Sequence, residues 1–307
     1  MRWMSCLSCA IALNLFVTGF AAADSVTFSN YSHGQVVADS YSPNNPDEVG
    51  TTDGKTVRLE VVNSANPSND PDLAVIFDSN IYDGDDPDLA GPPDRSWDAG
   101  NLAPDTDLGN LLIIQENADW KAKQKHFYIW GWKYSYWDLE WGNRNGNGIV
   151  DVGDIVDADD EAGRPAGYVD FFFSESIDTF GFDLVDVEGS VEHNAAYVAT
   201  FFNIAGDPIN SVLFRDFDDF QNDIEWGNNS ANRIDSRSIS DWTGGQILET
   251  MQVRIALGGS GAIDNLNFTY ATPTTPPGSS QPIPSPSALL AGLGGLGLMF
   301  ARRRRNR

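Results

Sequence analysis

Short apolar segments separated by turn residues run through most of this 307-residue chain. They are rich in β-branched and aromatic residues, and in the clearest of them Val57, Leu59 and Val61 alternate with polar residues, as in a strand with one buried face. Residues 73–77 are apolar throughout, so we expect that strand to be buried on both faces. The predicted strands are residues 25–28, 35–38, 55–63, 73–77, 110–115, 126–141, 168–173, 180–187, 197–204, 209–214, 247–257 and 262–270.

This pattern predicts an all-β fold. The strands follow one another at intervals that suit antiparallel neighbours, and turn signals such as 205–208 (AGDP) lie between them. No long helical period appears between residues 24 and 270. We therefore expect one antiparallel β-sandwich with long acidic loops over residues 24–270. An extended linker rich in Pro, Ser and Thr is expected over residues 271–282.

The amino end of the chain predicts export. Arg2 and an apolar run over residues 6–20 precede three alanines that end at Ala23, which is typical of a signal peptide cut by signal peptidase. Residues 1–23 would then be removed. Cys6 and Cys9 both lie in this segment, so the exported chain has no thiol for a disulfide or a metal. Lipid attachment at Cys9 is a less favoured alternative.

The carboxyl end predicts a transient stop in the inner membrane. An apolar run over residues 288–301 is followed by a basic cluster that is costly to move across a bilayer. The run is shorter than the roughly 20 residues of a spanning helix, and its four glycines weaken it further. The cluster consists of Arg302, Arg303, Arg304 and Arg305.

Residues 283–307 resemble the PEP-CTERM sorting signal of bacterial envelope proteins, in which a Pro-Glu-Pro motif, an apolar segment and an Arg cluster follow one another. Pro284 and Pro286 match the prolines of the motif, and Ser285 stands in place of its Glu. The resemblance implies cleavage by a membrane protease called exosortase. It also implies a final location in the cell envelope or extracellular matrix, with transient inner-membrane anchoring.

The segment between these two ends is strongly acidic. Six of the 19 Lys and Arg lie in the removed ends, so 13 basic side chains face 44 acidic ones, a net charge of −31. Such a chain should bind neither nucleic acid nor anionic lipid, and cations are its natural partners. The carboxylates are either calcium ligands, since they cluster with Gly, Asn and Pro, or a solvated acidic surface.

Two kinds of loop predict calcium binding. The sequence DPDL occurs at 70–73 and 86–89, and its Pro fixes the backbone between two carboxylates. The second of these loops offers Asp85, Asp86 and Asp88 as ligands. Residues 143–154 fit the twelve-residue EF-type loop and resemble its dockerin variant, with a solvated acidic turn as the alternative. The ligands in that loop would be Asn143, Asn145, Asn147, the carbonyl of Ile149, Asp151 and Asp154.

Residues 126–141 (HFYIWGWKYSYWDLEW) are the most aromatic part of the chain. If they form one strand, its aromatic side chains fall on a single face, which is either core or a platform for sugar rings. Lys133 and Ser135 on the other face prefer water, which favours the core interpretation. On the alternative interpretation Trp130, Trp132 and Tyr134 are the candidate glycan ligands.

Residues 262–268 (AIDNLNF) resemble the final strand of jelly-roll domains of the galactose-binding or carbohydrate-binding-module type. The resemblance implies that the sandwich is jelly-roll-like. In that family the last strand often supplies a ligand to a structural calcium, which would implicate Asp264. An ordinary strand with a polar residue is the alternative.

Familiar catalytic motifs are absent from the sequence. It contains no Gly-rich phosphate loop, no G-x-S-x-G elbow and no H-E-x-x-H, and it has 3 histidines. We therefore expect a non-catalytic envelope or matrix protein that is stabilised by calcium and binds exopolysaccharide. A secreted polysaccharide hydrolase is the alternative, since it needs only two carboxylates. The terminal arginines argue against a eukaryotic lipid-anchored protein, whose signal ends in the apolar run.

Overall fold

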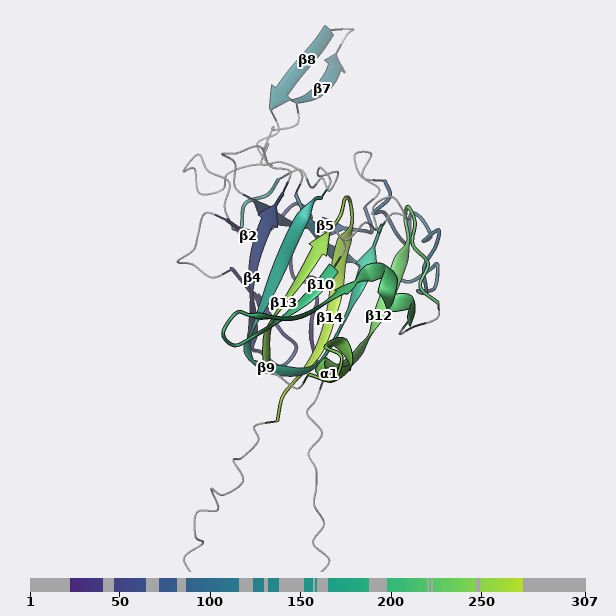
Figure 1. Ribbon diagram of the computed structural model, residues 1–307. Helices are drawn as coiled ribbons and strands as arrows, with labels where there is room; N and C mark the ends of the chain where they lie inside the picture. The colour runs from purple at the N-terminus through teal and green to yellow at the C-terminus, as the bar shows by residue number, and fades with distance from the viewer. Residues whose placement is uncertain are drawn as a thin grey trace, which may run out of the picture. The chain divides into compact units, whose positions relative to one another are not determined.

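Antiparallel strands form nearly all of the regular structure in the computed structural model of the protein (Figure 1). The structure describes residues 23–40, 47–64, 72–81, 87–115, 124–129, 132–137, 152–156, 158, 165–187, 198–219, 221, 223–246 and 249–272. Within these ranges one sheet contains twelve strands: β1 (Asp24–Val26), β2 (Val36–Asp39), β3 (Asp47–Gly50), β4 (Thr56–Asn63), β5 (Leu73–Asp78), β6 (Asn110–Ile114), β9 (Gly167–Val185), β10 (Val198–Asn203), β11 (Pro208–Leu213), β12 (Ala231–Ser238), β13 (Thr250–Leu257) and β14 (Ala262–Tyr270).

The predicted all-β antiparallel fold is therefore confirmed. Helical structure in the described residues is limited to the 3₁₀ turn η1 (Phe214–Asp219) and the short helix α1 (Ile239–Trp242). None of the described helices is long and apolar enough to cross a membrane. The described residues up to Ala271 belong to one compact unit.

The 19-residue strand β9 connects the two halves of the sheet (Figure 1). Its first part, residues 167–173, pairs with β4 and β13, whereas its second part, residues 177–185, pairs with β12 and β14. Ser174 and Glu175 at the change of partners are exposed. The two strands predicted at 168–173 and 180–187 are thus parts of one bent strand.

Because β9 changes partners, the sheet folds into two facing layers. One has the order β3-β4-β9-β13-β10-β11, and the other has the order β2-β5-β6-β14-β9-β12, with β1 beside β14. A cluster of buried side chains from both layers fills the space between them, including Leu59 and Phe171 of one and Ile76 and Phe268 of the other. Burying each such side chain contributes about 1.5–3 kcal/mol.

Strand β5 is buried on both faces, as its apolar sequence predicted. Ala74 and Ile76 lie in the core between the layers. The odd-numbered residues of β5 lie in a second core on the outer face of the same layer. Leu89, Trp97 and Leu108, from the segment before β6, cover this second core. The indole N–H of Trp97 donates to the carbonyl of Thr106 at 2.8 Å. This hydrogen bond links two parts of the covering segment.

The prediction of one strand over residues 126–141 was wrong. The chain forms a separate two-stranded hairpin there, in which β7 (Gln124–Ile129) pairs with β8 (Trp132–Trp137) and Ile129 lies opposite Trp132. From residue 128 to residue 136, aromatic residues alternate with other residues without a break, so this alternation gave no sign that the chain reverses direction. Gly131 was the signal available in the sequence, because two-residue hairpin connections favour glycine.

Candidate functional site

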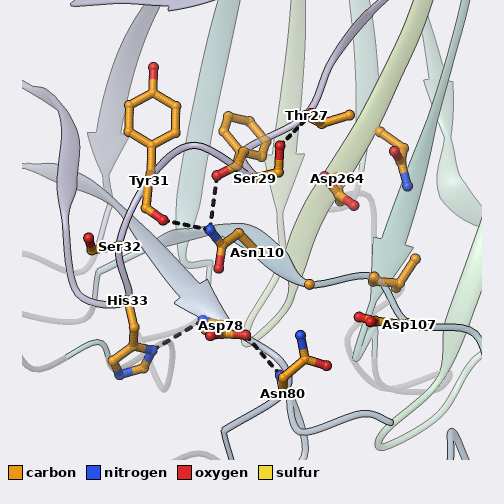
Figure 2. A pocket seen from close by; sticks show the side chains of 14 residues that line it. Thr27, Ser29, Tyr31, Ser32, His33, Asp78, Asn80, Asp107, Asn110 and Asp264 are labelled. Carbon is orange, nitrogen blue, oxygen red and sulfur yellow. Dashed lines mark hydrogen bonds between the residues drawn. The ribbon is translucent and has the colours of Figure 1, made fainter. Parts of the chain in front are cut away.

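A hollow of about 620 Å³ opens where the turn after β1 faces the end of β5 and the bulged start of β14 (Figure 2). Most of its lining is polar. The residues that line it are Thr27, Phe28, Ser29, Tyr31, Ser32, His33, Asp78, Asn80, Asp107, Leu108, Gly109, Asn110, Asp264 and Asn265. It is the strongest candidate for a binding site among the described residues.

The side chain of Asn110 holds the turn that forms one wall. Its Nδ2 donates to the carbonyl oxygens of Phe28 at 3.0 Å and of Tyr31 at 2.8 Å (Figure 2). The turn closes through the Tyr31 N–H, which donates to the Phe28 carbonyl at 3.0 Å. Because Phe28 is fully buried, this wall is anchored in the core and does not depend on a ligand for its shape.

A second wall lies at the end of the buried strand β5. The backbone N–H of Asp78 donates to Nδ1 of His33 at 3.1 Å, so that ring nitrogen is unprotonated. The Asp78 carboxylate in turn accepts the N–H of Asn80 at 3.0 Å (Figure 2). Oδ1 of Asn80 is buried and has no hydrogen-bond partner.

Asp264 lies at the bulge where β14 shifts its register against β9. The neighbouring Asn265 adopts a left-handed backbone with φ 47°, and its Nδ2 donates to the Asp183 carboxylate at 2.8 Å. Asp183 is paired with Arg233 through two hydrogen bonds of 2.9 and 2.7 Å. Asp264 forms no ion pair with another described residue, and its buried Oδ1 has no hydrogen-bond partner.

The surroundings of Asp264 disfavour its charged form. Burial, and to a lesser extent the Asp183 carboxylate, raise the pKa of Asp264 well above its usual range. The Asn265 backbone N–H and the Arg233 guanidinium act in the opposite direction. The carboxyl group is only 2 % exposed, yet it lines the hollow. A ligand that donates a hydrogen bond there would satisfy an oxygen that is otherwise costly to bury.

The hollow therefore offers hydrogen-bond acceptors in excess. Asn80 and Asp264 each present an unpartnered buried oxygen, and Asp78 and Asp107 add two further carboxylates to the lining. The lining contains neither Lys nor Arg. Hydroxyl groups and cations are the chemical groups that match such a surface, whereas anions are repelled.

Three of the predicted calcium ligands lie in the described residues, at different places in the fold. Asp264 lines the hollow. Asp88 lies beside β12, where its backbone carbonyl accepts from the Asn229 side chain at 2.7 Å. The carbonyl of Asp154 accepts the N–H of Val36 in β2 at 2.9 Å. No group of three or more His, Cys, Asp or Glu side chains within the described ranges is arranged to hold a metal ion.

Most of the remaining predicted site residues lie outside the described ranges. Trp132 and Tyr134 lie in β8, in a part of the chain whose side chains are not described. Ala23, before the predicted cleavage point, is exposed and directly precedes β1. The residues outside the described ranges are Asp85, Asp86, Trp130, Asn143, Asn145, Asn147, Ile149, Asp151, Pro284, Pro286 and Arg302 to Arg305.

Sequence analysis missed most of the hollow. His33, Asp78, Asn80 and Asn110 were not singled out, because each is an isolated polar residue at the end or start of a strand. A usable signal was the position of Asp78 and Asn80 directly after the continuous apolar run 73–77, where polar side chains must turn away from the core. Only the pairing of β1, β5, β6 and β14 brings these residues together.

No protein-family model matches this sequence, and none of the curated proteins is significantly similar to it. The chemistry of the hollow and the sequence of the two ends are therefore the basis for assigning a function.

Proposed function

We propose that the protein is a non-catalytic, exported protein of the cell envelope or extracellular matrix that binds a hydroxyl-rich glycan in the hollow. The observation that carries the proposal is the pair of buried oxygens, Oδ1 of Asn80 and Oδ1 of Asp264, that line the hollow without a hydrogen-bond donor. Sugar hydroxyls supply such donors, and leaving buried acceptors unpaired costs about 1–3 kcal/mol each.

The charge of the lining narrows the class of glycan. Asp78 and Asp107 are acidic, and the lining contains neither Lys nor Arg to offset them. A polymer of uronic acids or sulfated sugars would meet repulsion from these carboxylates and from the acidic chain as a whole. The ligand that fits is a neutral exopolysaccharide.

Export and calcium binding complete the proposal. The signal-like residues 1–23 and the sorting-signal-like residues 283–307 support processing by signal peptidase and by an exosortase-type protease. Calcium supports the fold by neutralising carboxylates that repel one another, with the loop 143–154 as the candidate found in the sequence.

Binding of neutral oligosaccharides to the purified full chain, measured by calorimetry, tests the hollow. We expect neutral chains to bind and a polyuronate not to bind. Asn80→Ala and Asp264→Ala should each weaken binding about tenfold, since each removes one acceptor of roughly 1.4 kcal/mol. Asp105→Ala is the matched control, because Asp105 is exposed and does not line the hollow.

Two results would count against this site. Unchanged affinity in both hollow variants, with loss of binding in Trp132→Ala or Tyr134→Ala, would move glycan binding to the aromatic hairpin. Preferential binding of the polyuronate would contradict the charge argument. Thermal melting of each variant checks that a loss of binding is not a loss of fold.

A polysaccharide hydrolase is the second candidate, and one observation favours it. Burial raises the pKa of Asp264, as a general acid requires, and Asp78 and Asp107 line the same hollow as carboxylates that could serve as its partner. This alternative predicts release of reducing ends from a neutral polysaccharide, lost in Asp264→Asn. Binding without any release of reducing ends supports the non-catalytic role.

A further inference from the structure

The edges of the two layers meet at two acidic residues. Strand β2 lies at the edge of one layer and β3 at the edge of the other, and no backbone hydrogen bonds pair them. The contact between them is made by Asp39, the last residue of β2, and Asp47, the first residue of β3. The backbone N–H of Asp39 donates to Oδ2 of Asp47 at 2.8 Å and so crosses from one layer to the other.

Both side chains are nearly inaccessible to water. Asp39 is 7 % exposed and Asp47 is 6 % exposed, and Oδ1 of Asp47 is buried without any hydrogen-bond partner. Asp47 takes part in none of the ion pairs between described residues. Burial, together with the nearby Asp39 carboxylate, raises the pKa of Asp47 to about 6, against the effects of the Asp39 N–H and of Arg58. The buried Asp47 carboxylate has one unpartnered oxygen and a second carboxylate nearby, so a cation or a proton beside it would stabilise it.

A third segment closes around the same point. Residues 152–156 run along the edge of β2 that does not pair with β5, and Gly153 N–H donates to the Val36 carbonyl there at 2.9 Å. The N–H of Val152 donates to Oδ2 of Asp39 at 3.2 Å. This contact fixes one oxygen of Asp39 in place. It also brings backbone from a third part of the chain next to the Asp39 carboxylate.

We propose that Asp39 and Asp47 together bind one calcium ion, which clips the edge strands of the two layers to each other. Calcium accepts six to eight oxygen ligands at irregular angles, so two carboxylates leave room for backbone carbonyls and water. A bound divalent ion keeps both carboxylates charged and gives Oδ1 of Asp47 the partner it lacks. The inference deepens the calcium part of the proposed function and does not depend on the glycan hollow.

Thermal melting of the full chain with and without calcium tests the clip, with Asp47→Asn as the variant. The wild type should gain about 5–10 °C at a calcium concentration about 100 times the dissociation constant. Asp47→Asn should melt above the wild type in EDTA, because one buried charge is gone, and should gain less than half as much from calcium. Titration calorimetry should find one calcium ion fewer per chain in the variant.

The exposed residue Asp105 supplies the control, and Asp39 supplies a second variant. Asp105→Asn should keep both the calcium-dependent gain and the number of bound ions. Asp39→Asn should repeat the loss of one ion, which keeps the test decisive if Asp47→Asn fails to fold.

The outcomes separate this inference from the wider proposal. A full calcium-dependent gain and an unchanged number of ions in both variants would overturn the clip, leave calcium stabilisation through other loops intact and indicate a shared proton at the pair. A wild type that gains nothing from calcium would overturn the clip and the calcium part of the proposed function together. Neither result bears on glycan binding in the hollow.

Discussion

The salt bridge between Asp183 and Arg233 is the strongest single-residue test of the layer that holds the hollow. Asp183 is fully buried, and two hydrogen bonds tie it to Arg233. Arg233→Leu should lower the free energy of unfolding by about 3 kcal/mol, because a buried charge loses its partner. This value is at the low end for buried pairs, since the Arg233 side chain is 45 % exposed and water screens the charges.

Urea unfolding of the two leucine variants measures this effect. Arg215→Leu is the control, because Arg215 and its partner Asp216 are both exposed, and it should change stability by less than about 0.5 kcal/mol. Equal losses in the two variants would mean that water reaches Asp183 more easily than its burial indicates.

Individual residues could be predicted from the sequence only where a strand context pointed to them. Asp264 was predicted as a calcium ligand because its short motif resembles the last strand of jelly-roll domains, and the structure places Asp264 in the lining of the hollow. Asn80 and Asn110 could not be identified, since a lone amide at a strand end has no pattern of its own. The contact between Asp39 and Asp47 could not be predicted for another reason. The two residues share no sequence motif, and they meet only because two edge strands approach each other.

At the level of elements, Gly181 in β9 tests how closely β12 packs. A Cβ atom at Gly181 would lie 2.5 Å from the backbone nitrogen of Ser236 and 2.7 Å from the carbonyl oxygen of Ile234. Backbone atoms cannot rotate away as side chains can. Gly181→Ala should therefore destabilise the protein by about 1–3 kcal/mol.

Gly50 in β3 provides the matched control, because a Cβ atom there meets nothing within 4 Å. Gly50→Ala should change the free energy of unfolding by no more than about 1 kcal/mol, and in the stabilising direction. Chemical denaturation of both variants tests the pair. A Gly181→Ala variant as stable as Gly50→Ala would show that β12 moves aside freely.

Most strands could be predicted, and the exceptions have physical reasons. Alternating or continuous apolar residues marked β4, β5, β6, β13 and β14, whose burial follows from their sequence. The strands β3 (DEVG) and β12 (ANRIDSRS) were not predicted, because polar residues outnumber apolar ones and only pairing with a neighbour makes them strands. The bend in β9 was also missed, since polar residues at 174–176 resemble a turn.

At the scale of the whole molecule, the basic cluster at the end of the chain is the test of export. Replacing Arg302, Arg303, Arg304 and Arg305 with Ser should remove the barrier that stalls the chain in the membrane. Cell fractionation with intact-mass measurement should find the wild type outside the cytoplasm without residues 1–23 and without its basic tail. The variant should keep the tail.

Arg307→Ser is the control for this experiment, because it leaves the four adjacent arginines in place and should be processed as the wild type is. Recovery of the uncut 307-residue chain from the cytosol would contradict export and, with it, the access to ambient calcium on which the proposed function depends.

On the proposed export route, the shared strand β9 also sets the order in which the chain can fold. Strands β1 to β6 precede β9 in the sequence, and until it emerges β4 has one unpaired edge and the two layers have no common strand. On this proposed route, a chain that crosses the membrane from its amino end exposes unpaired strand edges until β9 follows. The dense negative charge of this chain is well suited to that interval, because mutual repulsion keeps neighbouring nascent copies from aggregating.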